Sequence, residues 1–369
     1  MKNGSIVVAG AGGFIGGHLV ADLLRQGHRK VRAVDVKPYD EWFQRHPGAE
    51  NLRLDLNDKE ACERAVKGAA TVYNLACNMG GMGFITTNRG LCMLSVLINT
   101  HLLMASRKSG VDRYFFSSSA CVYNADKQRS SDARPLVEAD AYPAQPEDGY
   151  GWEKLFSERM CRHFREDFGL ETRIGRFHPI YGPHGAWEGG REKAPAAMCR
   201  KVIHAVHTGS GEMEIWGDGT QSRTFLYVDD CLRALQILTR SDLAEPANIG
   251  STELVTIDQL ADIAQDIAGV RLRKVYNPSA PRGVTGRNSD NTLLTTHTGW
   301  TPSIGLRDGL ERNYRWIFDE YMAKYGPAAR RKTVSAPRPA ARKPAAKAKP
   351  KSTRTPARTP SRKAAAARR

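Results

Sequence analysis

The 369-residue sequence lacks the cysteine and histidine patterns on which disulfide frameworks and metal sites depend. Its seven cysteines are scattered without a C-x-x-C pair, and its ten histidines form no H-x-x-x-H pair. We therefore expect reduced thiols, a cytoplasmic location and no metal. No apolar run approaches the roughly 18–20 residues of a membrane span, and no signal-peptide pattern precedes the first apolar segment, so we also expect no membrane association.

Acidic residues are absent from residues 326–369, which hold 15 of the 55 lysines and arginines. The first 325 residues therefore carry 40 basic against 39 acidic side chains, and nearly all of the net charge of +16 belongs to the last segment. Because that segment is rich in Ala, Pro, Lys and Arg and has little to bury, we expect a disordered basic tail. Such a tail would attract nucleic acid or acidic surfaces, and a solubilising appendage is the alternative.

Short apolar segments alternate with helix-length segments through the first half of the chain. This alternation predicts βαβ units and an α/β fold with a doubly wound parallel sheet. The expected strands are Ile6–Ala9, Val31–Val36, Leu52–Leu56, Thr71–Ala76, Tyr114–Ser118 and Glu171–Arg176, and the expected helices are Ile15–Gln26, Lys59–Lys67, Leu91–Ser109, Tyr150–Phe168, Ile257–Ala268 and Leu306–Met322.

A glycine-rich run, Gly10-Ala-Gly-Gly13-Phe14-Ile15-Gly16, follows the first expected strand and opens a helix. Gly10 permits a tight turn, Gly13 lets the backbone approach a pyrophosphate, and Gly16 allows close packing of helix on strand. The N–H groups at the start of the helix are then available to an anion. In this context the run predicts a dinucleotide site.

Acidic residues at the ends of the next two strands refine that prediction. Asp35 is placed to bind the ribose hydroxyls of NAD and to repel the 2′-phosphate of NADP, although Lys37 nearby leaves NADP open. Asp55 is placed to meet the adenine, with a helix cap as its alternative role. We therefore divide the chain into an NAD-binding Rossmann-like domain (1–175), a smaller substrate-binding lobe (176–325) and the tail (326–369).

Tyr150 and Lys154 stand at i and i+4, on one face of an expected helix. An ammonium beside a phenol favours the phenolate, so we expect Lys154 to lower the pKa of Tyr150 toward neutrality and to make it a usable base. Ser119, at the end of an expected strand, would hold the substrate oxygen beside that phenol. With these motifs the chain, over roughly residues 5–320, resembles the extended short-chain dehydrogenases/reductases, the class of nucleotide-sugar epimerases and dehydratases.

Two further residues distinguish this chain within that class. Cys121 follows Ser118-Ser119-Ala120 and carries a thiol whose pKa can be tuned for proton abstraction, against the alternative of a small core cysteine. Lys193 lies in the glycine-rich run Gly189-Gly-Arg-Glu-Lys193-Ala-Pro, where the alternative is a solvated surface charge. Together they indicate an acid that faces a base.

These runs resemble the GDP-mannose 3,5-epimerase family. The resemblance implies that Tyr150 and NAD oxidise C4 of GDP-mannose, that Cys121 removes protons at C3 and C5 while Lys193 delivers them, and that C4 is then reduced again to give GDP-L-galactose. It also implies a homodimer formed through the helices at 91–109 and 150–168. The resemblance rests mainly on Asn74–Phe84, Ser118–Cys121, Arg176–His178, Gly189–Pro195, Trp216–Gly219 and Gly286–Asn291. The substrate contacts carried over from it are Gly80, Ser119, Ala120, Cys121, Glu192, Lys193, Ala194, Lys201, Gln221, Ser222, Arg223 and Arg287.

The sequence departs from the family pattern at three positions. Asn78 replaces an acidic residue, Pro179 replaces an Asn that contacts the sugar nucleotide, and Thr285 replaces an Arg. An epimerase or reductase of another nucleotide sugar, such as a GDP-heptose, is therefore the alternative within enzymes. An NAD-binding scaffold whose tail docks on nucleic acid is the alternative outside them.

Overall fold

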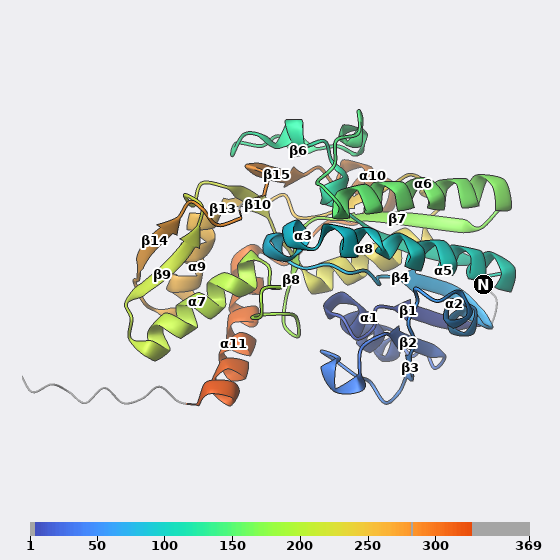
Figure 1. The fold of residues 1–369 in the computed structure, drawn as a ribbon, viewed down its shortest axis with the longest axis horizontal. Helices are drawn as coiled ribbons and strands as arrows, with labels where there is room; N and C mark the ends of the chain where they lie inside the picture. Colours follow the sequence, from blue (N-terminus) through green and yellow to red (C-terminus); the bar gives the residue numbers. More distant parts are fainter. Residues whose placement is uncertain (1–3, 282, 327–369) are drawn as a thin grey trace, which may run out of the picture. The chain divides into compact units, whose positions relative to one another are not determined.

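A seven-stranded sheet dominates the computed structural model, which describes residues 4–281 and 283–326 (Figure 1). Its strand order is β12-β7-β5-β4-β1-β2-β3, and every neighbouring pair is parallel. The direction of winding reverses between β1 and β4, so the carboxyl ends of these strands border a crevice. The expected doubly wound sheet is confirmed, with strands β1 Ser5–Ala9, β2 Val31–Asp35, β3 Glu50–Arg53, β4 Ala69–Asn74, β5 Arg113–Ser119, β7 Glu171–Phe177 and β12 Ala247–Ile249.

Helices cover both faces of this sheet. On one face α2 (Lys59–Val66), α5 (Ser95–Ser109) and α6 (Tyr150–Phe168) pack side by side, and on the other α1 (Phe14–Arg25) packs against α8 (Val228–Arg240) (Figure 1). The strand residues alternate between the two apolar cores, since Phe115 belongs to one and Phe116 to the other. This alternation explains why the central strands read as continuous apolar runs.

Shorter sheets and further helices build the second lobe and its border with the first, where α4 packs on α6 and α10 packs on β12. These elements are β6 Pro135–Leu136, β8 Ile180–Tyr181, β9 Glu212–Trp216, β10 Ser222–Thr224, β11 Leu226–Tyr227, β13 Leu254–Thr256, β14 Arg273–Asn277 and β15 Gly286–Ser289, with α3 Met82–Thr87, α4 Arg89–Met93, α7 Ala194–Thr208, α9 Ile257–Ala268, α10 Thr292–Thr298 and α11 Leu306–Tyr325.

The chain crosses between the two lobes more than once. β6 precedes residue 176 yet pairs with β15, and β12 follows it yet completes the large sheet beside β7. The boundary at 175/176 stays a prediction, and the described residues form one compact unit. The expected disordered tail lies outside the described residues, except for Gly326.

Most expected elements agree with the structure, and the third strand is the clearest exception. We expected Leu52–Leu56, whereas β3 spans Glu50–Arg53. β3 lies at the edge of the sheet and pairs with β2 alone. Its last residue, Arg53, pairs with Asp35, the last residue of β2, so the strand ends there. Leu54 and Leu56 still pack on the core after the strand has ended.

The stretch Arg89–Ser109 is long and apolar enough, by length and composition, to cross a membrane, although we expected no such segment. In its most apolar window 44% of the residues are buried, and α5 packs against α2 and α6. The stretch is apolar because one face of α5 packs in the core and a further face of the helix is also apolar. All seven cysteines are free thiols, while the cytoplasmic location stays a prediction.

A buried ion pair fastens α6 to the sheet. Glu158 of α6 accepts hydrogen bonds from Nε and Nη2 of Arg176 in β7, at 2.9 and 2.8 Å. Ser118 of β5 donates a third hydrogen bond to the same carboxylate. Both charged side chains are at most 4% exposed, so each charge depends on the other for compensation.

Replacing one partner should therefore destabilise the fold strongly. We expect Glu158→Gln to lower the free energy of unfolding by about 3–5 kcal/mol, because it leaves the Arg176 guanidinium buried without its carboxylate. Chemical denaturation measures the loss. Glu166→Gln, which breaks the exposed pair with Arg162, is the control and should barely change stability. Equal effects of the two variants would contradict this account.

Candidate active site

The loop between β1 and α1 has the close packing that a dinucleotide site requires. Gly10 has φ +83°, a left-handed conformation that favours glycine. A Cβ on Gly16 would lie 2.1 Å from the carbonyl oxygen of Gly10, so no larger residue fits there. Gly13 is the N-cap of α1 and supplies no side-chain cap, so the N–H groups of the first turn lack intrahelical acceptors. They can receive a pyrophosphate.

Asp35 lies at the end of β2 and is 8% exposed. Its carboxylate accepts hydrogen bonds from the N–H of Gly12 at 2.9 Å and of Lys37 at 3.1 Å. The Lys37 ammonium donates to the Gly12 carbonyl oxygen at 3.3 Å and lies over the Phe43 ring. Backbone groups thus fix the carboxylate where a ribose would donate its hydroxyls, and the nearby lysine already has partners.

Asp55 is exposed and does not cap α2. Its carboxylate accepts a hydrogen bond from the N–H of Asn57 at 2.9 Å, and the N-cap of α2 is Asp58, which accepts from Glu60. The alternative role as a helix cap is therefore wrong. Asp55 instead borders the cavity described next.

A cavity of about 670 Å³ opens beside the glycine-rich loop, where β1 and β4 diverge. Its orphaned helix N–H groups and its fixed carboxylate match the pyrophosphate and the ribose of a dinucleotide. The predicted coenzyme residues that line it are Gly10, Gly13, Phe14, Ile15, Gly16, Asp35, Asp55 and Tyr150, whereas Lys154 borders neither this cavity nor the next.

Lys154 lies behind Tyr150 in the same helix. It is 1% exposed, with its ammonium 3.7 Å from a carboxylate oxygen of Glu153 and 5.6 Å from the centre of the Tyr150 ring. Although burial opposes its charge, Cys77 and Glu153 keep the pKa of Lys154 above its usual value. The residue that should support a phenolate is thus held as a cation.

The phenol nevertheless does not have the pKa that the sequence predicted. Burial raises the pKa of Tyr150 well above its ordinary value, and the charges of Cys77, Cys121 and Glu153 raise it further. A hydrogen bond with Ser119 acts in the opposite direction. The expectation that Lys154 brings this pKa toward neutrality is therefore wrong for the structure described.

Cys77 is an active-site residue that motif reasoning missed. It borders the coenzyme cavity, and its charge acts on the pKa values of both Tyr150 and Lys154. In the sequence, Cys77 is one position of the run Asn74–Phe84, which resembles the family as a whole and does not single out this thiol. Only the end of β4, which faces the start of α6, places its thiol beside the pair.

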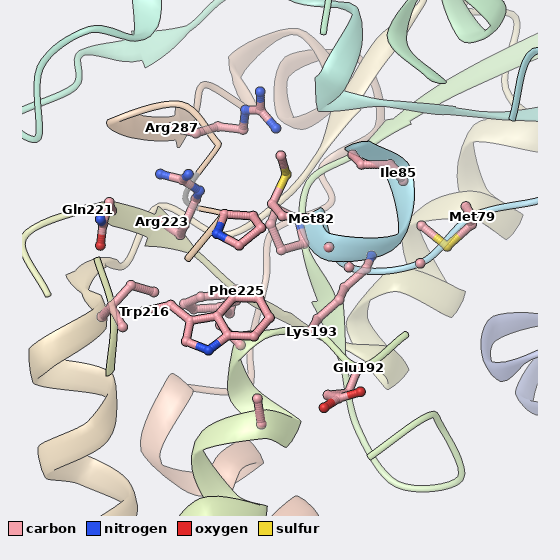
Figure 2. Close-up of a pocket in the computed structure, with 18 of the residues that line it drawn as sticks. Met79, Met82, Ile85, Glu192, Lys193, Trp216, Gln221, Arg223, Phe225 and Arg287 are labelled. Carbon is pink, nitrogen blue, oxygen red and sulfur yellow. The ribbon is translucent and has the colours of Figure 1, made fainter. Parts of the chain in front are cut away.

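Cys121 and Lys193 both line a second cavity, of about 240 Å³, and Figure 2 shows Lys193 at its border. Cys121 follows β5 in a short 3₁₀ turn, and burial raises the pKa of its thiol to about 11, with Glu147 adding to the rise and Arg287 opposing it. Lys193 is the N-cap of α7, and burial lowers the pKa of its ammonium, which Cys121 and Cys77 oppose. A protonated thiol and an amine that loses its proton readily can exchange protons with a substrate.

The second cavity gathers nearly all predicted substrate contacts. Ser222 is the exception, because its hydroxyl donates to the carbonyl oxygen of Ser131 instead of facing the cavity. The predicted residues that line it are Gly80, Ser119, Ala120, Cys121, Tyr150, Glu192, Lys193, Ala194, Lys201, Gln221, Arg223 and Arg287.

Two features of this cavity suit a charged, polar ligand. Arg223 of β10 and Arg287 of β15 occupy paired positions in the second-lobe sheet, and Figure 2 shows both at one end of the cavity. The Gln221 amide is buried, and neither its nitrogen nor its oxygen has a hydrogen-bond partner among the described residues. Such an amide has its full hydrogen-bonding capacity left for a ligand.

The departures from the family pattern lie at different places. Pro179 borders the second cavity beside Phe177 and Phe225, where it adds apolar surface in place of an amide. Asn78 borders the coenzyme cavity, and its N–H donates to Ser95. Thr285 borders neither cavity and pairs through its backbone with Gln128 and Ser222.

Ser119, Tyr150 and Lys193 border both cavities. A coenzyme in the first and a substrate in the second would therefore meet at the Tyr150 phenol. The arrangement can oxidise a hydroxyl and exchange protons at carbons next to it.

Comparisons with known proteins agree with this geometry. A family model described as NAD dependent epimerase/dehydratase family matches residues 6–250. GDP-mannose 3,5-epimerase 1 of Oryza sativa subsp. japonica is 44% identical over 316 residues, which are 85% of this chain and 82% of that protein. GDP-mannose 3,5-epimerase of Arabidopsis thaliana is 42% identical over 320 residues, which are 86% and 83% of the two chains.

Solved structures show the same fold. UDP-glucose 4-epimerase of Thermotoga maritima, solved with UDP-glucose, has a TM-score of 0.77 at 25% identity and covers 86% of this chain and 99% of its own. MoeE5, solved with UDP-glucose and NAD, has a TM-score of 0.69 at 30% identity and covers 86% and 99%. The resemblance found in the sequence is confirmed, and so is NAD as the coenzyme.

The Asp35 carboxylate should carry much of the affinity for NAD. We expect Asp35→Ala to weaken NADH binding by about 10- to 100-fold, because hydrogen bonds to a charged group contribute about 1.5–3 kcal/mol. The same change should reduce the preference of the protein for NADH over NADPH. Fluorescence titration measures both, with the exposed Asp40→Ala as control. Unchanged NADH affinity in Asp35→Ala would contradict the assignment.

Proposed function

The chain belongs to the NAD dependent epimerase/dehydratase family, and from this premise we propose that it epimerises GDP-mannose at C3 and C5 to GDP-L-galactose. That it is an NAD-dependent nucleotide-sugar epimerase follows from the comparisons themselves. The observation that carries the finer proposal is the position of Ser119, Tyr150 and Lys193 on the shared border of both cavities, with Cys121 facing the substrate side.

The residues at this border handle the C4 oxygen. Bound NAD supplies reversible hydride acceptance at C4, which leaves no net redox change over the whole reaction. The Tyr150 phenol must first lose its own proton; as a phenolate, stabilised by the charged Lys154, it takes the proton of the C4 hydroxyl, and Ser119 hydrogen bonds to the same oxygen.

Cys121 and Lys193 act on the carbons beside C4. A ketone at C4 makes the hydrogens on C3 and C5 acidic, because each carbanion is stabilised by the carbonyl. As the resemblance implies, Cys121 removes a proton from one face once it has ionised to the thiolate, and Lys193 delivers a proton to the other face from its protonated, ammonium form. Inversion at both carbons, followed by reduction of C4, gives the L-galacto sugar.

The guanidinium groups of Arg223 and Arg287 suit a nucleoside diphosphate, since planar guanidinium groups bind phosphate oxygens in pairs. Lys201 also borders the cavity, where its ammonium lies 5.5 Å from the centre of the Trp216 ring. The names of the plant relatives support GDP-mannose as the sugar nucleotide.

Pro179 favours a second candidate, the epimerisation of another nucleotide sugar such as a GDP-heptose. The proline, Phe177 and Phe225 give the cavity an apolar wall where the family pattern has an amide. Such a wall suits a sugar with a different pattern of hydroxyl groups. The same proton-exchange residues would serve it.

Proton exchange with solvent tests the proposal and separates the two candidates. Incubation with GDP-mannose in D₂O should replace the hydrogens at C3 and C5 with deuterium, as followed by NMR. Cys121→Ala should reduce this exchange at least about 100-fold, since positioned proton transfer contributes about 10²–10⁴-fold. Cys62→Ala, which removes a remote core thiol, is the control.

A fully active Cys121→Ala enzyme would exclude Cys121 from the chemistry. Exchange with another GDP-sugar, but none with GDP-mannose, would favour the second candidate. Absence of exchange with every nucleotide sugar tried would overturn the proposal.

We also propose that two chains associate through α5 and α6. These neighbouring helices expose large apolar side chains, including Leu97 and Met104 on α5 and Trp152 and Phe156 on α6. Exposed apolar side chains gathered on adjacent helices are typical of an association surface.

Phe156 is 56% exposed and should be central to that surface. Light scattering should give the wild type a mass twice that of the 40.8 kDa chain, and Phe156→Glu should give the monomer mass because it places a charge in the apolar contact. Phe318→Glu on α11, 42% exposed, is the matched control and should remain dimeric. A monomeric wild type would disprove the interface.

A further inference from the structure

Glu147 contacts three parts of the active site, although it belongs to no motif in the sequence. Its N–H donates to the carbonyl oxygen of Cys121 at 2.9 Å, and its own carbonyl oxygen accepts from the N–H of Gly151 in α6 at 2.8 Å. Its carboxylate lies 2.7 Å from Nη2 of Arg287. One residue therefore joins the cysteine turn, the helix that carries Tyr150, and β15.

The Arg287 guanidinium is fixed between this carboxylate and the thiol. Its Nη1 lies 3.7 Å from the Cys121 sulfur, and its Nε donates to Gln128 at 2.6 Å. The side chains of Arg287 and Glu147 are 7% and 12% exposed, so water screens their charges weakly. Both charges act on the sulfur atom.

The two charges have opposite effects on the thiol. A cation beside sulfur favours the thiolate, whereas a carboxylate favours the protonated thiol. Burial is the largest cause that raises the pKa of Cys121 to about 11; the charge of Glu147 adds to the rise, and that of Arg287 opposes it. The other titratable or charged side chains that act on Cys121 are Tyr150 of α6, Lys193 of α7 and Arg223 of β10.

We propose that Glu147 is a positioning residue that, by neutralising Arg287 beside the sulfur atom, holds Cys121 as a protonated thiol in the substrate-free protein. The inference rests on the proposed function, in which Cys121 exchanges protons with substrate carbon. A thiol must lose its proton before it removes one from carbon, so this pair sets the pH range in which the exchange runs. A protonated thiol also resists oxidation and alkylation, which require the thiolate.

Alkylation of Cys121 reports its ionisation without any substrate. The NAD-loaded protein is treated with iodoacetamide across a pH series, and mass spectrometry follows the peptide that contains Cys121. Glu147→Gln should shift the midpoint of the rate profile down by about one to three pH units, because the Arg287 charge is then unopposed at the sulfur. At neutral pH the labelling rate should rise at least about tenfold.

Two variants test the cause. Glu147→Asp keeps the charge and should remain near the wild-type midpoint. Asp148→Asn is the matched control, because it removes a neighbouring carboxylate whose exposed pair with Arg89 does not face the thiol, and it should leave the midpoint unchanged. If Glu147→Gln does not fold, Arg287→Gln provides the opposite test, since the unopposed carboxylate should shift the midpoint upward.

A wild-type midpoint in folded Glu147→Gln, or no upward shift in Arg287→Gln, would overturn the inference. Since alkylation needs no turnover, its outcome is independent of the proposed function. Shifted midpoints without deuterium exchange from any nucleotide sugar would retain the role of Glu147 and reject the function. Deuterium exchange with GDP-mannose together with unshifted midpoints would retain the function and reject the role of Glu147.

Discussion

The buried pair of Glu158 and Arg176 is the constraint on which the active site depends. It holds α6 against β7, and Ser118 of β5 joins the same carboxylate. Lys154 and Tyr150 lie about one and two turns nearer to the start of the same helix, so this anchor also sets where the phenol lies. Separating these two charges inside the core would leave each of them buried without compensation, so the ion pair favours a single position of the helix against the sheet.

A second constraint is the reversal of winding between β1 and β4. It places a glycine-rich turn, the end of β4 and the end of β5 at one edge of the sheet, which brings Cys77 and Ser119 to the same phenol. The second lobe then supplies Lys193 and the two arginines from elements that no local pattern connects with these strands. The reactive groups therefore come together where the residues at the sheet edge meet those of the second lobe.

Burial at this meeting point shifts the pKa of each reactive group toward its uncharged form. Burial raises the pKa values of Tyr150 and Cys121 and lowers that of Lys193, while Lys154 stays charged beside Glu153 and Cys77. Sequence reasoning overestimated the influence of Lys154 because it weighed one neighbouring charge and could not include desolvation. The same limit hid Glu147, whose importance comes from a partner 140 residues away.

The sequence by itself determined the sheet class, the bounds of α6 and α9 and the glycine turn, and it singled out Tyr150, Cys121 and Lys193, which line one cavity. Each of these rests on local periodicity or on a short run of residues. Only the tertiary structure decided that β6 and β12 cross between lobes, that Ser222 turns away from the cavity, and that Asp55 caps no helix. It also decided the directions in which the pKa values of the reactive side chains shift. Those outcomes depend on burial and on contacts between distant segments, and neither is present in a local pattern.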